Sequence, residues 1–222
     1  MKIDVAIDGP AGAGKSTIAK LVGKRFKLMY INTGAMYRAV ALKAKEKGLS
    51  PEKVDAICNL IDKMEMHFEN DDLYLNGQNI QAEITTPEIS NSVSNYASIK
   101  EIRKKLVTLQ KNMSKKYDVI MDGRDIGTVV LKDTNFKFFL TATPEERANR
   151  RFMELKERNI ECEYDVILED IKKRDYIDSN RETDPLRKSE DAILIDSTNL
   201  DIDGVVNEIC IKIDDILSKR RN

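Results

Sequence analysis

The strongest constraint on the fold is a glycine-rich stretch near the start of the chain, Gly9-Pro10-Ala11-Gly12-Ala13-Gly14-Lys15-Ser16-Thr17. An apolar-leaning run, residues 2–8, precedes it and is typical of a short buried strand. Residues 15–26 follow, with apolar side chains at helical spacing. A glycine-rich turn between a strand and a helix that ends in Gly-Lys-Ser is the P-loop motif. The pattern predicts a phosphate site at the N-terminus of the first helix.

Each residue type in this stretch has a chemical reason to be there. The glycines let the backbone curl, so that several N–H groups point at one anion. Lys15 is predicted to reach the β and γ phosphates of ATP, and the Ser16 hydroxyl is predicted to bind Mg²⁺. We therefore predict ATP binding, with Mg²⁺, by the whole stretch from Gly9 to Thr17. The alternative is a glycine-rich turn that binds nothing, which the strand–helix context disfavours.

Strand-like runs that alternate with helical patterns predict an α/β fold. Five parallel strands are expected near residues 2–8, 28–32, 117–121, 136–140 and 192–195. With helices between the strands, the prediction is a three-layer P-loop fold in one domain.

Two shorter stretches carry local signals. Apolar runs within residues 65–81, broken by Asn76-Gly77, predict a small antiparallel sheet inserted between helices. Ser50 as a helix cap with Pro51 at the first helical position predicts a helix that starts there.

Composition excludes several classes of protein. With 37 basic and 38 acidic side chains, the net charge of −1 gives no indication of a nucleic-acid partner. Cys58, Cys162 and Cys210 lie far apart, which argues against a disulfide framework or a zinc site and favours a reducing cytoplasm. No apolar run approaches ~18 residues, so neither export nor a membrane span is expected. His67, the one histidine, lies in the small inserted sheet and is expected to have no catalytic role.

Arginines beside carboxylates follow the predicted strands. Ligands of an open α/β sheet sit beyond the carboxyl ends of its strands, and the planar fork of arginine binds phosphate bidentately. The residues at these places are Thr33 and Arg38 after the second strand, Asp122, Arg124 and Asp125 after the third, Arg147, Arg150 and Arg151 after the fourth, and Arg174, Asp178 and Arg181 further on. For the charged run from Arg147 to Arg158, surface ion pairs remain an open alternative.

Together these segments resemble the bacterial cytidylate kinases (CMP/dCMP kinases), a branch of the nucleoside monophosphate kinase family of P-loop proteins. Beyond the P-loop, the matching segments are Asn32-Thr33-Gly34-Ala35-Met36-Tyr37-Arg38, Asp122-Gly123-Arg124-Asp125-Ile126-Gly127-Thr128-Val129-Val130, Glu146-Arg147-Ala148-Asn149-Arg150-Arg151 and Arg174-Asp175-Tyr176-Ile177-Asp178-Ser179-Asn180-Arg181. They span nearly the whole chain in order, and the segment that begins at Asp122 is the most specific.

The resemblance implies a role for each residue. CMP binding is implied for Thr33, Arg38, Ser94, Arg103, Arg124, Asp125, Arg174, Asp178 and Arg181. Arg38, Arg124 and Arg181 would clamp the phosphate, Ser94, Arg103 and Asp125 would read cytosine with Thr33 close by, and Arg174 and Asp178 would hold the sugar. Catalysis would rest on Lys15, Arg124, Arg151 and Arg181. Arg147 would approach ATP, and Asp122 would hold the metal through water.

The resemblance also implies an organisation and a reaction. One kinase domain, residues 1–222, would contain a monophosphate-binding region at 33–103, with the inserted sheet near 57–89, and a short helical lid at 147–160. The expected reaction is transfer of a phosphate from ATP to CMP or dCMP by a cytoplasmic monomer. Its partners would be these small molecules, without nucleic acid or membrane.

Three alternatives remain open from the residues. The nearest alternative is a kinase for another monophosphate, UMP or AMP. A P-loop protein that hydrolyses ATP to drive a change of shape would need no arginine clamp for an acceptor, and a structural protein with a vestigial P-loop would bind no ATP.

Overall fold

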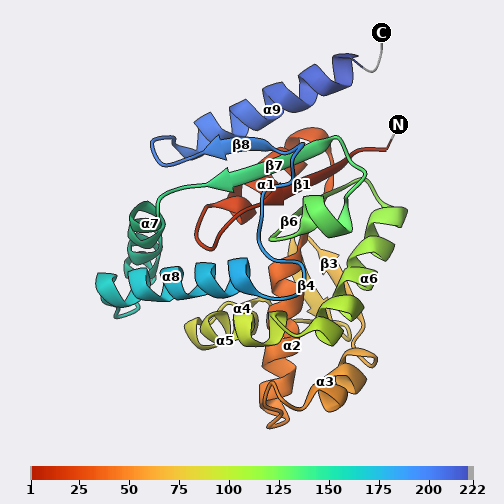
Figure 1. Ribbon diagram of the computed structural model, residues 1–222, viewed down its shortest axis with the longest axis vertical. Coiled ribbons are helices and arrows are strands. Elements are labelled where there is room, and N and C mark those ends of the chain that lie inside the picture. The colour runs from red at the N-terminus through yellow and green to blue at the C-terminus, as the bar shows by residue number, and fades with distance from the viewer. Residues whose placement is uncertain (1, 220–222) are drawn as a thin grey trace.

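The centre of the protein is a five-stranded parallel sheet with strand order β2-β6-β1-β7-β8 (Figure 1). The computed structural model describes residues 2–219. The strands of this sheet are β1 (Asp4–Asp8), β2 (Met29–Asn32), β6 (Val119–Gly123), β7 (Phe136–Thr141) and β8 (Ile193–Asp196). All five predicted strands are confirmed, and they are joined by helical crossovers as parallel neighbours require.

Helices make up most of the remaining described chain. They are α1 (Lys15–Phe26), α2 (Thr33–Glu46), α3 (Val54–Ile61), α4 (Gln81–Ile84), α5 (Pro87–Ala97), α6 (Lys100–Lys116), α7 (Pro144–Glu157), α8 (Tyr164–Asn180), α9 (Ile202–Lys219) and the π-helical turn η1 (Ile126–Val130). No helix within residues 2–219 is both long enough and apolar enough to cross a membrane.

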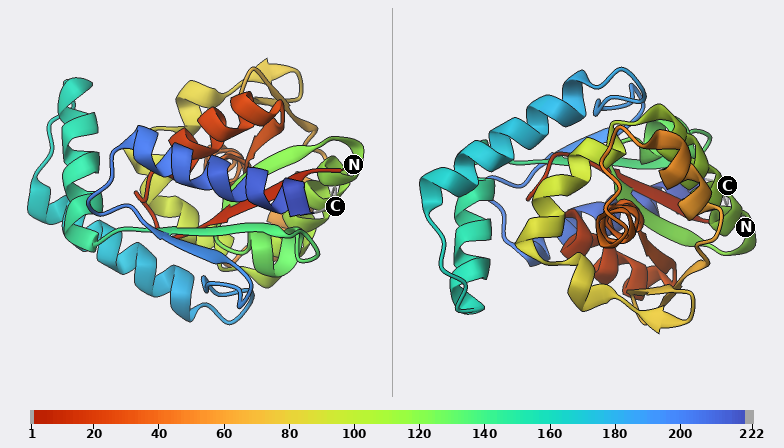
Figure 2. Two further views of the ribbon diagram at one scale, coloured as in Figure 1. Left: turned by 90° about the horizontal axis from the view of Figure 1, so that it is seen from above. Right: turned by 90° about the horizontal axis from the view of Figure 1, so that it is seen from below.

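The two faces of the sheet carry two separate apolar cores. Along β1, Val5 and Ile7 pack with side chains of α1 and α9, whereas Ala6 faces the other way, toward α2 and α6. This alternation follows from the two-residue period of a strand. Figure 2 shows α1 and α9 side by side over one face. The result is the predicted three-layer arrangement, with the carboxyl ends of all five strands at the same edge of the sheet.

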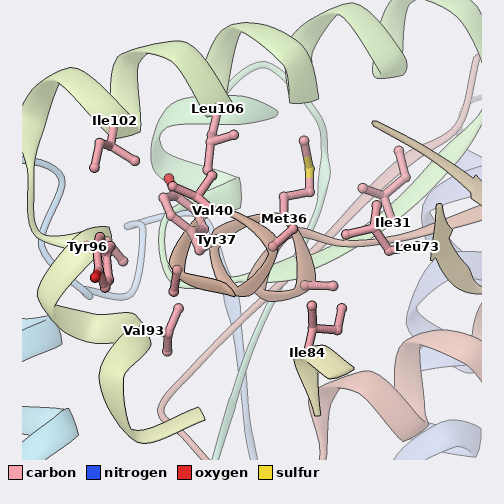
Figure 3. Close-up of a cluster of buried hydrophobic side chains, with 14 of the residues drawn as sticks. Ile31, Met36, Tyr37, Val40, Leu73, Ile84, Val93, Tyr96, Ile102 and Leu106 are labelled. Atoms are coloured by element: carbon pink, nitrogen blue, oxygen red, sulfur yellow. The ribbon is translucent and has the colours of Figure 1, made fainter. Parts of the chain in front are cut away.

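A small three-stranded antiparallel sheet extends the core around α2. Its strands are β3 (Met66–Glu69), β4 (Asp72–Leu75) and β5 (Gln78–Asn79). Leu73 and Leu75 are buried, and Figure 3 shows Leu73 beside Ile31 in the cluster around α2. Asn76 and Gly77 have positive φ angles of 49° and 81°, as a tight hairpin turn requires. The predicted inserted sheet is therefore confirmed.

The helix predicted to start at Pro51 begins later. Helix α3 starts at Val54, and Lys53 occupies its N-cap position. The Lys53 N–H donates to the Ser50 carbonyl at 2.9 Å, which closes a turn over these residues. Proline suits the second position of such a turn as well as it suits the first turn of a helix, so the sequence signal was ambiguous.

Helices α7 and α8 pack on each other at one side of the molecule (Figure 1). They share a small apolar cluster of Ala148, Leu155, Ile167 and Ile171, separate from the two large cores. Thr143 caps α7 by accepting from the Glu146 N–H at 3.2 Å, as its Thr-Pro-Glu-Glu start predicts. This helix pair carries several of the arginines that the sequence analysis selected.

Candidate active site

The P-loop connects β1 to α1 at the carboxyl edge of the central sheet (Figure 1). Its glycines Gly9, Gly12 and Gly14 have φ angles of 151°, 75° and 84°. A Cβ atom at Gly9 would lie 1.9 Å from the Leu140 carbonyl oxygen, so no larger residue fits there. The backbone therefore has the curled form in which successive N–H groups can surround a phosphate.

Lys15 begins α1 and is buried inside the loop. Its ammonium donates to the Pro10 carbonyl at 2.6 Å. Burial lowers the pKa of Lys15 well below its usual value, and nearby Arg124 adds to this effect, while Asp122, Asp178 and Asp8 oppose it. The loop lysine thus lies close to charged groups in and just after β6, the third predicted strand, and on α8.

Ser16 and Asp122 form a pair of oxygen donors beside the loop. The Ser16 hydroxyl donates to Asp122 Oδ2 at 2.9 Å, and the Tyr30 hydroxyl donates to Asp122 Oδ1 at 2.9 Å. Hydroxyl and carboxylate oxygens suit Mg²⁺, which binds few protein groups and takes its other ligands from water and phosphates. Within residues 2–219 there is no cluster of three or more acidic, histidine or cysteine side chains that could hold a metal alone. The Ser16–Asp122 pair therefore fits a metal that arrives with a nucleotide.

Four arginines from different elements lie in one group. Arg38 comes from α2, Arg124 follows β6, Arg151 lies on α7 and Arg174 lies on α8. Burial lowers the pKa of Arg174 to about 10, and the neighbouring Arg124, Arg38 and Arg151 contribute in the same direction. The pKa of Arg38 is also lowered, mainly by burial and further by Arg124 and Arg151. The Nε atoms of Arg38 and Arg174 are buried without a partner among the described residues. Clustered guanidinium groups whose Nε donors lack a partner among the described residues are suited to bind an anion.

Asp178 links this group to Arg181. Arg124 Nε donates to Asp178 Oδ2 at 2.8 Å, and the other carboxylate oxygen lies 3.9 Å from Arg181 Nη1. Although burial opposes it, the positive charge of Arg124 lowers the pKa of Asp178. The arginines predicted to clamp a phosphate, Arg38, Arg124 and Arg181, are therefore brought together instead of being scattered over separate surfaces.

The residues predicted to read cytosine form a buried ion pair. Arg103, on α6, is 1% exposed and donates from Nη2 to Asp125 Oδ2 at 2.5 Å. Arg181 Nη2 lies 3.6 Å from the other oxygen of Asp125, so the pair adjoins the phosphate-clamp arginines. Ser94 is buried on α5. The Thr33 hydroxyl donates to the Asp122 carbonyl at 2.7 Å, which fixes it beside the strand end.

Arg147, predicted to approach ATP, lies beneath the P-loop. Its Nη1 donates to the Ala11 carbonyl at 2.8 Å, its Nε to the Ala142 carbonyl at 2.9 Å, and its Nη2 to Asp175 at 2.6 Å. The side chain is 3% exposed. Arg147 therefore contacts the main chain of the loop and connects it to α7 and α8.

Replacing Arg147 with methionine is expected to lower the free energy of unfolding by about 3 kcal/mol, because it leaves a partly buried Asp175 and two carbonyl groups without a donor. The same change should raise the KM for ATP, since the P-loop loses its support. Urea unfolding and steady-state kinetics measure the two effects. Arg158→Met, at the exposed end of the same helix, is the control. An unchanged stability for Arg147→Met would contradict the supporting role.

The sequence analysis missed Asp8, the last residue of β1. Its carboxylate accepts from the Ile126 N–H at 2.8 Å and the Gly127 N–H at 2.7 Å, which ties the strand before the P-loop to the turn after Asp125. Burial raises the pKa of Asp8 to about 7, against the effect of these two hydrogen bonds. The only signal in the sequence was an acidic residue directly before Gly9, inside a run expected to be buried.

Fold and site together define a P-loop nucleotide-binding protein of the α/β class, with a group of arginines near the loop lysine. The model of the cytidylate kinase family matches residues 5–215. A cytidylate kinase of Clostridium perfringens is 67% identical over 207 residues, or 93% of this chain and 95% of the relative. A cytidylate kinase of Clostridium acetobutylicum is 61% identical over 209 residues, or 94% of this chain and 96% of the relative. The chain belongs to the cytidylate kinase family.

A solved structure of an uncharacterized protein from Eubacterium ventriosum shares the fold. The two chains are 14% identical, with a TM-score of 0.52 over 97% of this chain and 99% of the other. At this level of identity the similarity concerns the fold alone.

Proposed function

We propose that the protein transfers the terminal phosphate of ATP to CMP and dCMP, forming CDP or dCDP and ADP. The observation that carries the proposal is the group of Arg38, Arg124, Arg151 and Arg174, whose charge is only partly compensated and which adjoins Lys15. A protein that only hydrolyses ATP needs no second anion site facing its P-loop. Membership of the cytidylate kinase family supports the choice of acceptor.

In the proposed reaction an oxygen of the CMP phosphate bonds to the γ-phosphorus of ATP, while the bond from that phosphorus to the β–γ bridging oxygen breaks. The acceptor oxygen is already anionic, so no strong general base is needed. Catalysis then consists of positioning and stabilisation of the charge on the moving group. Lys15, Arg124, Arg151 and Arg181 are the proposed sources of that stabilisation.

The P-loop from Gly9 to Thr17 is the proposed ATP site. Its backbone N–H groups would hold the phosphates, with Arg147 acting through the loop carbonyl that it contacts. We propose Ser16 as the direct ligand of Mg²⁺ and Asp122 as a ligand through water. The metal would supply charge neutralisation on the phosphates of ATP.

The buried Arg103–Asp125 pair is the proposed reader of cytosine, with Ser94 and Thr33 beside it. A carboxylate accepts from the exocyclic amine of cytosine, and a guanidinium donates to its N3 or O2. Uracil reverses the pattern at positions 3 and 4, which would leave Asp125 facing an oxygen and Arg103 facing an N–H. Such a mismatch in a buried site is costly. The proposed ligands of the sugar are Arg174, which belongs to the arginine group, and Asp178, which accepts a hydrogen bond from Arg124 of that group.

We propose that residues 33–103 form the monophosphate-binding region, with the inserted sheet near 57–89, and that residues 147–160 form a lid within the single domain 1–222. In support, apolar side chains of residues 147–160 pack with α8 in a cluster separate from the two large cores, and Arg147 at the start of the segment contacts the P-loop. Its closure would exclude water, a competing acceptor of the phosphate. We further propose a cytoplasmic monomer. The well-separated free cysteines Cys58, Cys162 and Cys210 suit a reducing compartment.

Turnover with ATP and each of the five common nucleoside monophosphates tests this function. CMP and dCMP are expected to lead, with UMP slower by about 10²-fold or more in kcat/KM. A lead for UMP or AMP would assign the protein to a different acceptor. ATP hydrolysis that does not respond to added CMP would overturn the proposal altogether.

A further inference from the structure

Asp184 lies in the segment between α8 and β8, outside every motif that the sequence analysis selected. This segment is fastened to the end of α8, because the Leu186 N–H donates to the Asp178 carbonyl at 2.8 Å. Asp184 therefore keeps a fixed place near Asp178, which binds Arg124 of the arginine group. Asp184 makes one polar contact through its side chain and another through its main-chain carbonyl.

The side chain and the main chain of Asp184 bind two different arginines of the site. Its Oδ2 accepts from Arg103 Nε at 3.3 Å. Its carbonyl oxygen accepts from Arg181 Nε at 2.8 Å and also from Arg181 Nη2. One residue thus connects the proposed cytosine reader to the proposed phosphate clamp.

The backbone of Asp184 has a left-handed conformation, with φ at 49°. Non-glycine residues rarely adopt it, although aspartate and asparagine tolerate it better than most. Both contacts are made in this one conformation. Strained positions of this kind are held in place by their surroundings and cluster at functional sites.

The donors of Arg103 explain why the second carboxylate matters. Nε faces Asp184, Nη1 donates to the Ala97 carbonyl at 3.1 Å, and Nη2 faces Asp125. A planar guanidinium held on two sides has only one orientation for its third side. Asp184 also shares the positive charge of a side chain that is 1% exposed. Without Asp184, Asp125 would be the one carboxylate among the described residues still paired with Arg103.

We propose that Asp184 is a positioning residue that orients Arg103 and Arg181 and thereby sets the discrimination between cytosine and uracil. The inference rests on the proposed CMP site and extends it. Arg103 donates to Asp125 Oδ2 only and shares its charge with Asp184, so Asp125 Oδ1 stays available to the exocyclic amine of cytosine. With Asp184 neutral, the guanidinium would lose one of its fixed sides and be free to rotate onto both oxygens of Asp125, where it would compete with the base.

The test is Asp184→Asn, which keeps the size of the side chain and tolerates the left-handed backbone. It is expected to raise the KM for CMP about tenfold and to lower the ratio of kcat/KM for CMP over UMP about tenfold, with the KM for ATP within about twofold. Asp184→Gly removes the same carboxylate without backbone strain, so it gives the same test if the asparagine variant does not fold. Glu182→Gln, an exposed acid in the same segment, is the matched control and should behave as the unmodified protein does.

Coupling to Arg103 separates positioning from simple support of the fold. In an Arg103→Lys background, Asp184→Asn should not change the ratio of kcat/KM for CMP over UMP any further, because lysine lacks the planar guanidinium that Asp184 orients. A lower unfolding midpoint with unchanged KM and selectivity would overturn the inference, as would equal losses for CMP and ATP. If the unmodified protein phosphorylates CMP and the variants match it, this inference alone fails. If the unmodified protein does not use CMP, the proposed function fails and takes this inference with it.

Discussion

Replacement of Lys15 with methionine is expected to lower kcat for phosphoryl transfer about 10³-fold or more and to leave the fold intact. Lys15 lies inside the P-loop, where a cation can follow the charge that develops on the moving group. In the part of the chain that the structure describes, its ammonium makes one hydrogen bond, to the Pro10 carbonyl. Because burial already disfavours the ammonium, removing it should cost little stability.

Steady-state turnover with ATP and CMP, combined with thermal unfolding, measures both parts of this prediction. Lys24→Met, on an exposed position of the same helix, should have neither effect. Near-normal turnover of the Lys15 variant would contradict the proposed mechanism. A collapse of stability would mean that the lysine maintains the loop instead.

Replacement of Arg38 with methionine is expected to lower kcat/KM for CMP about 10³-fold while the free energy of unfolding stays within about 1 kcal/mol of its value in the unmodified protein. The Nε of Arg38 is buried without a partner among residues 2–219, and burial lowers the pKa of the side chain. A charge held under these conditions costs the folded state free energy, so its place is explained by a ligand. In contrast, Arg103 and Arg147 have protein partners whose loss would destabilise the fold.

The measurement is kinetic, with CMP varied at saturating ATP and the KM for ATP determined separately. Isothermal titration with CMP should show weaker binding for the same variant. Arg187→Met, exposed in the segment after α8, is the control for removal of one positive charge. An Arg38 variant that unfolds readily and keeps its KM for CMP would identify Arg38 as a structural residue.

The central architecture could be predicted because its signals are local. Short apolar runs predicted the strands, apolar side chains at helical spacing predicted the helices, and the Asn76-Gly77 turn placed the small sheet. The predicted start of α3 at Pro51 was wrong, because Ser50 and Pro51 suit a turn as well as the start of a helix. Local propensity does not decide between two conformations that both accept the same residues.

For the candidate site, the sequence alone supplied residue types, and the resemblance to a family supplied their roles. Ser94 and Arg103 carried no signal of their own, since both lie on helices at positions that resemble an exposed face. Asp8, Asp175 and Asp184 were not selected, because a carboxylate acquires its role from the group that it faces. Those partners lie 118, 28 and 81 residues away along the chain.

By itself, the sequence determined the P-loop, the order of strands and helices, and the anionic character of the ligands, because glycine torsions, side-chain periodicity and arginine chemistry act over a few residues. Only the tertiary structure decided which arginines remain without partners and which are held in ion pairs. Among residues 2–219, Arg38 Nε has no hydrogen-bond partner, whereas Arg147 uses its donors on the P-loop and Asp175. The physical reason is that burial and counter-charges depend on neighbours from distant segments, and folding alone brings these together.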